Sequence, residues 1–335
     1  MKRNQNPLNT VVKRASEILP SMRFKDGDFS LWQQNAKEKL EELLGLPLAN
    51  CDDLFSVEYE KERDEYNEIR FTFQSEDGYF VPCHLLIPKG VEKLPPLVIC
   101  LQGHSTGMHI SLGRPKHSPR DEESIAGERD FAVGALKRGY CALTIEQRGM
   151  GECGGAENGD TACHIHTMPN LLIGRTTIGE RVWDIMRALD VVTERFSDVF
   201  DKDNIICLGN SGGGTAAFYT ACLEERIKTA VVSCAFCGYD ASIMPIVHCT
   251  CNFVPGIRKY FEMGDLGGLI APRNLVVVSG KNDPIFPIDS AVKNFEITKK
   301  LYSYTNGKCI QAIGDGGHRF YYNTTWQAYD ELVKY

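Results

Sequence analysis

A serine flanked by glycines is the first group in this sequence that could do chemistry. It stands in Gly209-Asn210-Ser211-Gly212-Gly213, directly after the apolar run 205–208 and before a helical stretch. This G-x-S-x-G pattern is typical of a sharp strand-to-helix turn that exposes a serine hydroxyl as a nucleophile. The glycines let the neighbouring backbone pass close to a strained serine. Ser211 is therefore the predicted nucleophile.

The pentapeptide alone has low specificity, since three fixed positions of this kind arise by chance in roughly one chain of this length in ten. A glycine-rich turn or a phosphate-binding loop would look similar. A Walker loop, however, needs a lysine before its Ser or Thr, and this segment has none. The predicted strand and helix on either side favour the nucleophile.

A serine nucleophile needs a histidine as its base and a carboxylate that orients the histidine. In this architecture the chain order is serine, acid, histidine. Of the 8 histidines only His248 and His318 follow Ser211, and His318 lies in a glycine-rich loop after the last predicted strand. Asp283 lies between Ser211 and His318, just after the predicted strand 275–278. The predicted triad is Ser211, Asp283 and His318. The alternatives for the acid are Asp240, Asp265 and Asp289.

Two backbone N–H groups are expected to stabilise an oxyanion beside Ser211. One belongs to Gly212, at a helix start whose dipole favours negative charge. The other belongs to His104, in the glycine-punctuated loop after the predicted strand 97–101. The His104 side chain is interpreted as a residue of the rim rather than a catalytic group. The substrate-binding residues expected at this rim are Phe236, Tyr239, Phe286, Phe320 and Tyr321.

Short apolar runs that alternate with helix-length segments must position these groups. Such runs are typical of strands buried on both faces of a mostly parallel sheet. The predicted strands are 97–101, 141–145, 205–208, 229–234, 275–278 and 309–313. The predicted helices are 130–137, 178–196 and 213–225.

The remaining segments define the expected domain organisation. Residues 1–54 are predicted to be a helical arm that packs on the core, and residues 55–335 a single α/β domain. Residues 55–88 alternate in β fashion and predict antiparallel strands at a sheet edge. Segments 104–129 and 235–268 fit no regular element and are expected to form a rim or lid.

The composition excludes several classes of function. The 335 residues carry a net charge of −7 without a basic block, so neither nucleic acid nor an anionic membrane is an expected partner. No apolar run is long enough to span a bilayer, and the N-terminus has no apolar region typical of a signal peptide. The 13 cysteines form no disulfide framework, which indicates a reducing, cytoplasmic location.

A cysteine- and histidine-rich segment, 234–251, contains Cys234-x-x-Cys237 and His248-Cys249-x-Cys251. Four soft ligands of this kind could bind zinc, and Cys163-His164-Ile165-His166 adds further candidates. Packed free thiols are the favoured interpretation, because Cys234 ends a predicted strand. No metal and no cofactor are therefore predicted.

The residues from 55 onward resemble the α/β-hydrolase superfamily, specifically acetyl xylan esterases, cephalosporin deacetylases and dienelactone-hydrolase-like proteins. The resemblance rests on the Ser211 pentapeptide, Asn282-Asp283-Pro284, Gly317-His318, Gln147-Arg148-Gly149-Met150-Gly151 and the helix 181–190. It implies an α/β-hydrolase fold and carboxylic ester hydrolysis through a serine acyl-enzyme, often with release of acetate from sugars. Gln102 and the segment 235–265 depart from the esterase pattern. Arg148 is interpreted as a residue that ties loops together beneath the site.

The predicted function is therefore that of a serine carboxylic ester hydrolase that removes short acyl groups, such as acetyl, from carbohydrate or other small esters. One alternative is a serine peptidase of the prolyl-oligopeptidase type, although the large N-terminal domain usual in such enzymes is not evident. Another is an inactive hydrolase fold that serves as a binding protein, which would not need all three triad residues. The expected partner is a small ester, and the sequence leaves a homo-oligomer open.

Overall fold

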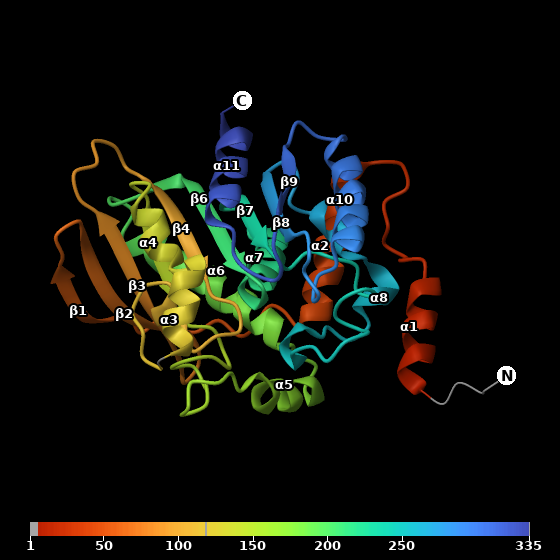
Figure 1. Cartoon of the computed structure of the whole chain (residues 1–335), viewed down its shortest axis with the longest axis horizontal. Coiled ribbons are helices and arrows are strands. Elements are labelled where there is room, and N and C mark those ends of the chain that lie inside the picture. Colours follow the sequence, from red (N-terminus) through yellow and green to blue (C-terminus); the bar gives the residue numbers. More distant parts are fainter. Residues whose placement is uncertain (1–5, 118, 335) are drawn as a thin grey trace.

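The computed structural model describes residues 6–117 and 119–334, which form a nine-stranded sheet with helices on both faces (Figure 1). The strands are β1 (Ser56–Glu62), β2 (Tyr66–Glu76), β3 (Tyr79–Pro88), β4 (Pro96–Leu101), β5 (Cys141–Ile145), β6 (Asp201–Asn210), β7 (Ile227–Ser233), β8 (Asn274–Gly280) and β9 (Cys309–Gly314). Each predicted strand corresponds to one of these elements.

The strand order is β1-β2-β3-β5-β4-β6-β7-β8-β9. Strand β1 pairs antiparallel with β2, β2 with β3, and β3 with β5, whereas all neighbours from β5 to β9 run parallel. This confirms the mostly parallel sheet with antiparallel strands at one edge. Because the carboxyl ends of parallel strands lie along one rim of the sheet, the loops after β4, β6, β8 and β9 converge there.

The apolar runs are continuous because both faces of the sheet are covered. In β4, Leu97, Ile99 and Leu101 point into one hydrophobic core, while Val98 and Cys100 point into the other. Successive residues of a strand face opposite sides, so a strand covered on both faces needs apolar residues at every position.

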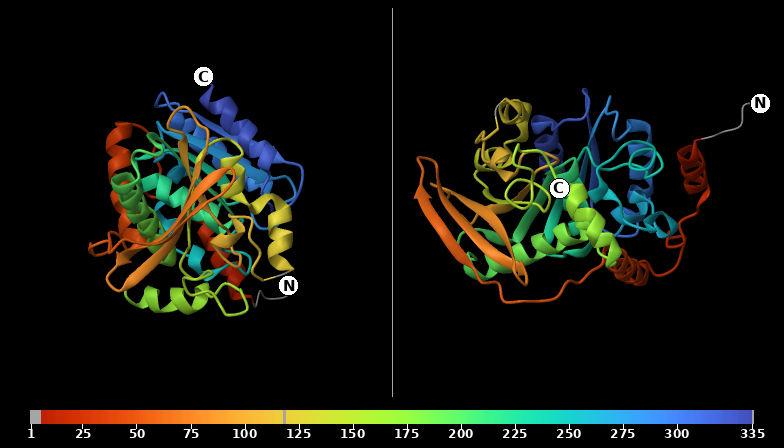
Figure 2. Two further views of the ribbon diagram at one scale, coloured as in Figure 1. Left: turned by 90° about the vertical axis from the view of Figure 1, so that its left-hand side faces the viewer. Right: turned by 90° about the horizontal axis from the view of Figure 1, so that it is seen from below.

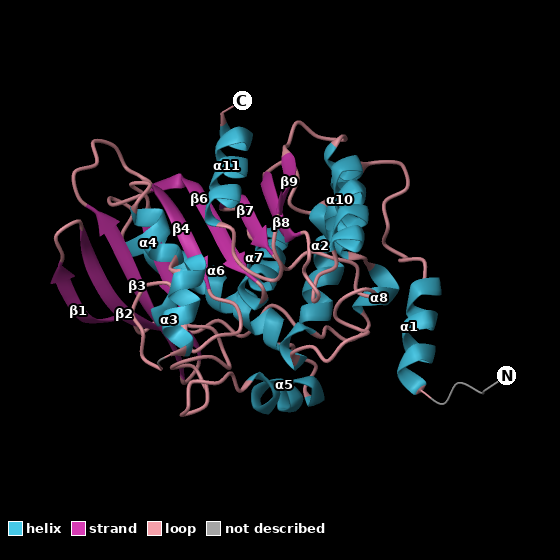
Figure 3. Cartoon of the chain, viewed as in Figure 1, coloured by secondary structure: helices cyan, strands magenta, loops and turns pink. Residues whose placement is uncertain are grey.

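The helices are α1 (Pro7–Glu17), α2 (Phe29–Leu44), α3 (Arg120–Ser124), α4 (Phe131–Leu136), α5 (Cys163–Leu172), α6 (Thr177–Arg195), α7 (Gly212–Leu223), α8 (Ile257–Tyr260), α9 (Met263–Gly267), α10 (Ile288–Tyr302) and α11 (Tyr322–Val333). Helices α4 and α11 cover one face of the sheet, and α6 and α7 the other, as the layers in Figure 3 show. Helix α10 packs on α9 and the edge strand β9. No helix in the described part of the chain is long and apolar enough to cross a membrane.

The N-terminal segment contains two separate helices. Helix α1 stands at the side of the molecule opposite β1 to β3 (Figure 2). Asp28 caps the N-terminus of helix α2, where its carboxylate accepts a hydrogen bond from the Leu31 N–H, and the helix buries Leu40 and Leu44 against α6 and α7. Leu31 itself is exposed and takes no part in this packing.

The two segments that fit no predicted element contain short helices. Segment 104–129 holds a 3₁₀ turn at Met108–Ile110, helix α3 and a π-helical turn at Ile125–Arg129. Segment 235–268 holds a 3₁₀ turn at Thr250–Asn252, then α8 and α9.

Candidate active site

Ser211 occupies a strained turn between β6 and α7. Its φ of 56° and ψ of −125° are unfavourable for a residue with a side chain, at a cost of roughly 1–3 kcal/mol. The surrounding backbone holds this conformation, since the Ser211 N–H donates a 2.8 Å hydrogen bond to the carbonyl of Ser233 on the neighbouring strand β7. The turn lifts the hydroxyl out of the sheet at the carboxyl end of β6.

Glycine is required on either side of this turn. A Cβ atom at Gly209 would lie 2.1 Å from the carbonyl oxygen of Gly213, and one at Gly213 would lie 2.1 Å from the carbonyl oxygen of Leu101. Both distances are far below van der Waals contact with rigid backbone. Because these glycines have no side chain, β6, the Ser211 turn and α7 can approach one another this closely.

The structure brings Ser211, Asp283 and His318 together. Nε2 of His318 lies 2.9 Å from Oγ of Ser211, and Nδ1 of His318 lies 2.8 Å from Oδ2 of Asp283. Asp283 comes from the loop after β8 and His318 from the loop after β9. This hydrogen-bonded chain can pass the serine proton to the imidazole and stabilise the resulting imidazolium.

The Asp283 carboxylate is buried and held by its own loop. Its Oδ1 accepts hydrogen bonds from the N–H groups of Ile285 at 2.8 Å and Phe286 at 3.0 Å. Burial alone would raise the pKa of Asp283, but the hydrogen bond and charge of His318, together with these N–H groups, hold it below its ordinary value. The carboxyl therefore remains ionised at neutral pH.

Aromatic packing fixes the orientation of the His318 ring. The Phe286 ring lies parallel to it, with centroids 5.8 Å apart and planes 16° apart, and His248 meets the edge of Phe286. Burial is the main cause that lowers the pKa of His248 to about 4. His248 is therefore uncharged at neutral pH.

The loop after β4 lies directly against Ser211, because Leu101 and Gly209 are paired in the sheet. A Cβ atom at Gly103 would lie 3.0 Å from the Cβ of Ser211, and one at Gly212 would lie 2.8 Å from the His104 ring. The Gly212 N–H is also among the first N–H groups of α7, which have no partner within a helix. Both predicted oxyanion residues thus border the serine.

A cavity of about 270 Å³ opens beside Ser211. Its lining combines polar and apolar side chains from the connections that follow β4, β6, β7, β8 and β9: His104, Arg129, Ser211, Ile246, Val247, His248, Cys249, Ile285 and His318. No sequence pattern identified the other lining residues as candidates for the site: Arg129, Ile246, Val247 and Ile285. Arg129, Ile246 and Val247 come from the two segments that were expected to form a rim or lid, and Ile285 comes from the loop after β8.

The aromatic residues predicted to bind substrate do not line this cavity, and that expectation is corrected. All five are buried: Phe236, Tyr239, Phe286, Phe320 and Tyr321. Phe236 packs edge-on against Phe218, and the hydroxyl of Tyr239 lies 2.6 Å from that of Tyr219. Burying aromatic rings of this size in the core stabilises the fold more than exposing them at a rim. These rings therefore pack in the core instead of lining the cavity.

The cysteines of segment 234–251 do not gather as one group. Cys234 Sγ lies 3.2 Å from the Arg319 carbonyl, and Cys237 Sγ lies 3.6 Å from that of Pro287. Cys249 and Cys251 turn the other way, toward His104 and Cys163. Their grouping with a residue at the start of α5 was not predicted by the spacing.

Arg148 ties loops together beneath the site. Its guanidinium is buried and donates to both oxygens of Asp184 on α6, at 2.8 and 2.9 Å. It also forms 3.1 Å ion pairs with Glu76 and Glu180. These contacts join the loop after β5 to α6 and β2.

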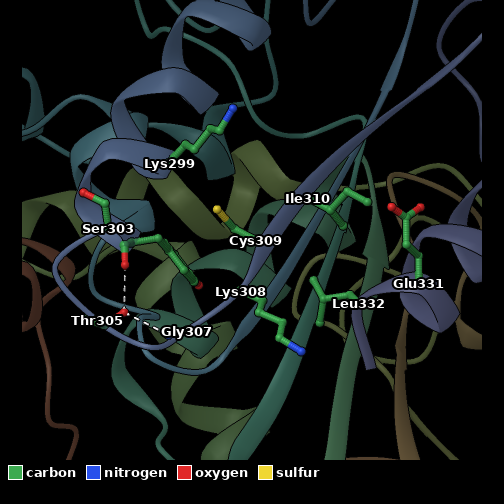
Figure 4. A pocket seen from close by; sticks show the side chains of 10 residues that line it. Lys299, Ser303, Thr305, Gly307, Lys308, Cys309, Ile310, Glu331 and Leu332 are labelled. Carbon is green, nitrogen blue, oxygen red and sulfur yellow. Dashed lines mark hydrogen bonds between the residues drawn. The ribbon is translucent and has the colours of Figure 1, made fainter. Parts of the chain in front are cut away.

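A second cavity, of about 550 Å³, lies between α10, β9 and α11 (Figure 4). Lys308 and Cys309 line it at the amino end of β9, whereas His318 follows the carboxyl end of that strand. This cavity therefore lies toward the amino end of β9, at the opposite end of the strands from Ser211, and none of the triad residues lines it.

Comparison with known proteins agrees with the fold. The chain matches the Abhydrolase family over residues 8–300. It is 28% identical over 251 residues to YtaP of Bacillus subtilis (strain 168), a protein provisionally named a hydrolase, with 71% of this chain and 78% of that protein covered.

Two solved structures show the same fold. A Bacteroides fragilis NCTC 9343 protein, provisionally described as an acetyl xylan esterase, superposes with a TM-score of 0.76 and 19% identity, over 92% of this chain and 82% of that one. A glucuronoyl esterase from Solibacter usitatus superposes with a TM-score of 0.69 and 14% identity, over 95% and 98%. The chain has the α/β-hydrolase fold and belongs to the Abhydrolase family.

Proposed function

We propose that the protein is a serine carboxylic ester hydrolase that acts through an acyl-enzyme. The observation that carries this proposal is the hydrogen-bonded chain from Ser211 Oγ through His318 to Asp283, at 2.9 and 2.8 Å. A binding protein has no need of this arrangement on a strained turn. The names of the two superposed structures, one a glucuronoyl esterase and the other provisionally an acetyl xylan esterase, are consistent with it.

The geometry supports a two-step reaction. His318 Nε2 takes the proton of Ser211 Oγ as the oxygen attacks the ester carbonyl, and the N–H groups of Gly212 and His104 stabilise the oxyanion. His318 then protonates the departing alcohol, which leaves an ester on Ser211. A water molecule gives its proton to His318, attacks that ester and releases the acid, and Ser211 regains its proton.

The cavity supports a short acyl group. Its volume of about 270 Å³ is small, and Ile246, Val247 and Ile285 supply an apolar wall. Arg129 adds a positive charge to the same lining. We therefore propose acetyl or similarly small acyl groups as substrates, carried on carbohydrate or other small alcohols.

A panel of substrates tests this function. The panel contains p-nitrophenyl acetate, butyrate and decanoate, an acetylated xylose and alanine p-nitroanilide. We expect kcat/KM for the acetate to exceed that for the decanoate by at least about tenfold, with negligible anilide cleavage. Ser211→Ala should abolish turnover, and Ser303→Ala, at an exposed serine of the loop after α10, should not. Preferential cleavage of the anilide would instead support a peptidase, and equal turnover by Ser211→Ala would contradict the proposal.

A further inference from the structure

Four side chains of types that can ligate a metal converge beside the candidate active site. His104 follows β4, Cys163 begins α5, and Cys249 and Cys251 flank the start of the 3₁₀ turn at Thr250–Asn252. One ligand atom from each lies within 4.8 Å of all the others. Cys251 Sγ is 3.1 Å from His104 Nε2 and 3.3 Å from Cys249 Sγ.

These separations between ligand atoms are close to those of a four-coordinate metal site. With Zn–S near 2.3 Å and Zn–N near 2.0–2.1 Å, the ligand atoms of a tetrahedral zinc site stand about 3.5–3.8 Å apart. Small adjustments of side chains would bring the four atoms to these distances. Three thiolates and one imidazole also form one of the sets typical of structural zinc, and soft sulfur ligands disfavour magnesium and calcium.

Arg181 provides an independent indication that this cluster is anionic. Its guanidinium is 1% exposed and donates to Cys163 Sγ at 3.2 Å, to Cys251 Sγ at 3.4 Å and to the Arg148 carbonyl at 2.6 Å. Within residues 6–117 and 119–334, no carboxylate forms an ion pair with it. A buried cation needs a counter-charge, and neutral thiols do not supply one.

The charges balance when the cluster holds a divalent ion. Three thiolates, a neutral imidazole and Zn²⁺ carry a net charge of −1, which the guanidinium of Arg181 neutralises. The three thiol protons pass to solvent as the sulfurs bind the metal. Without a metal, a single thiolate would already balance Arg181, so the guanidinium indicates an anionic cluster and the convergence of four ligand atoms indicates the ion.

We propose that His104, Cys163, Cys249 and Cys251 bind a zinc ion. All four coordination positions come from the protein, so the ion is structural and leaves no position for a substrate. It joins the loop after β4, helix α5 and the rim segment 235–268. Because His104 and Cys249 line the Ser211 cavity, the ion fixes the wall of that cavity and the His104 backbone. The proposal does not depend on the proposed esterase function.

Metal content measured by mass spectrometry tests the site. The full chain is expressed with zinc in the medium and dialysed against metal-free buffer. We expect about one zinc ion per chain in the wild type and a loss of at least about fivefold in Cys249→Ser. Cys309→Ser, at a half-buried thiol of β9 outside the cluster, is the matched control and should keep its zinc.

Cobalt substitution gives a second measurement on the unmutated chain, so the proposal stays testable if Cys249→Ser fails to fold. Co²⁺ should produce the sulfur-to-metal charge-transfer and visible absorption bands of a tetrahedral thiolate site. Added Zn²⁺ should displace the Co²⁺ and abolish these bands. Wild-type protein without bound zinc, retention of zinc in Cys249→Ser, or an intact mass showing that a cluster disulfide replaces the metal would each overturn the proposal.

Discussion

His318 and Asp283 come from different loops, yet Nδ1 of the histidine lies 2.8 Å from Oδ2 of the aspartate. Each loop begins where a parallel strand ends, and β8 and β9 are neighbours in register, with Gly280 opposite Gly314. The adjacency of these two strands therefore places the acid beside the base. Ser211 reaches the same imidazole from β6, two strands further into the sheet.

Replacing His318 by alanine should remove the general base. We expect kcat/KM for p-nitrophenyl acetate to fall by at least about 10³-fold, because Nε2 is the proton acceptor within reach of Ser211 Oγ. His164→Gln, at an exposed position of α5, serves as the control. Steady-state rates and circular dichroism measure activity and folding, and a folded His318→Ala with near wild-type rates would refute the role of this residue.

Asp283→Asn should retain the fold but lose most activity, by roughly 10³–10⁴-fold in kcat. The asparagine keeps the size of the side chain, but its amide offers no charge to the imidazolium and permits the wrong tautomer of His318. Steady-state kinetics at pH 7 measure the effect. A loss of less than tenfold would mean that another carboxylate orients His318.

Glu146→Gln should stabilise the protein increasingly as the pH rises from about 4.5 to about 8. Burial raises the pKa of Glu146 from 4.5 to about 8, although the N–H groups of Glu152 and Met108 oppose this shift. Between these values the unfolded chain releases a proton that the folded chain keeps, so the free energy of unfolding falls by up to about 1.4 kcal/mol per pH unit. Below 4.5 both states are protonated, and above 8 both are ionised, so the penalty is constant outside this window.

Thermal unfolding of wild type and Glu146→Gln across pH 4 to 9 measures this effect. The control is Glu157→Gln, at an exposed position, which should change Tm by the same small amount at every pH. A Tm difference for Glu146→Gln that does not change with pH would show that Glu146 has an ordinary pKa.

Arg148→Met should lower the free energy of unfolding by about 3–5 kcal/mol, because it leaves the buried carboxylate of Asp184 without its cation. Lys37→Met breaks the ion pair with the exposed Glu225 and should cost less than about 1 kcal/mol. Urea unfolding measures both variants. Equal, small losses would contradict a structural role for the Arg148 network.

Much of the fold and the triad could be predicted because each left a local pattern. The apolar runs of β4 to β8 follow from burial on both faces. Chain order, together with a position just after a predicted strand, selected Asp283 and His318 once Ser211 was assigned. The strained turn at Ser211 could be predicted because only glycines fit around it, as the 2.1 Å approaches at Gly209 and Gly213 show.

The lining of the cavity could not be predicted, because it depends on loops without periodicity. Ile246 and Arg129 come from irregular segments, and rings such as Phe320 pack into the core against Phe131 instead of reaching the rim. Cys163, Cys249 and Cys251 were among the candidate ligands in the sequence, but their grouping with His104 was not predicted, for a related reason. Cys163 meets Cys249 only through tertiary packing of α5 on the 3₁₀ turn at Thr250–Asn252, which no short spacing encodes.

Intact-protein mass spectrometry after treatment with a fluorophosphonate tests the central claim, that Ser211 is an activated nucleophile. The account predicts one phosphonyl adduct per wild-type chain, mapped to Ser211 by peptide sequencing, and none on folded Ser211→Ala. An adduct that persists on Ser211→Ala, or a wild-type protein that hydrolyses esters while Ser211 stays unmodified, would contradict it.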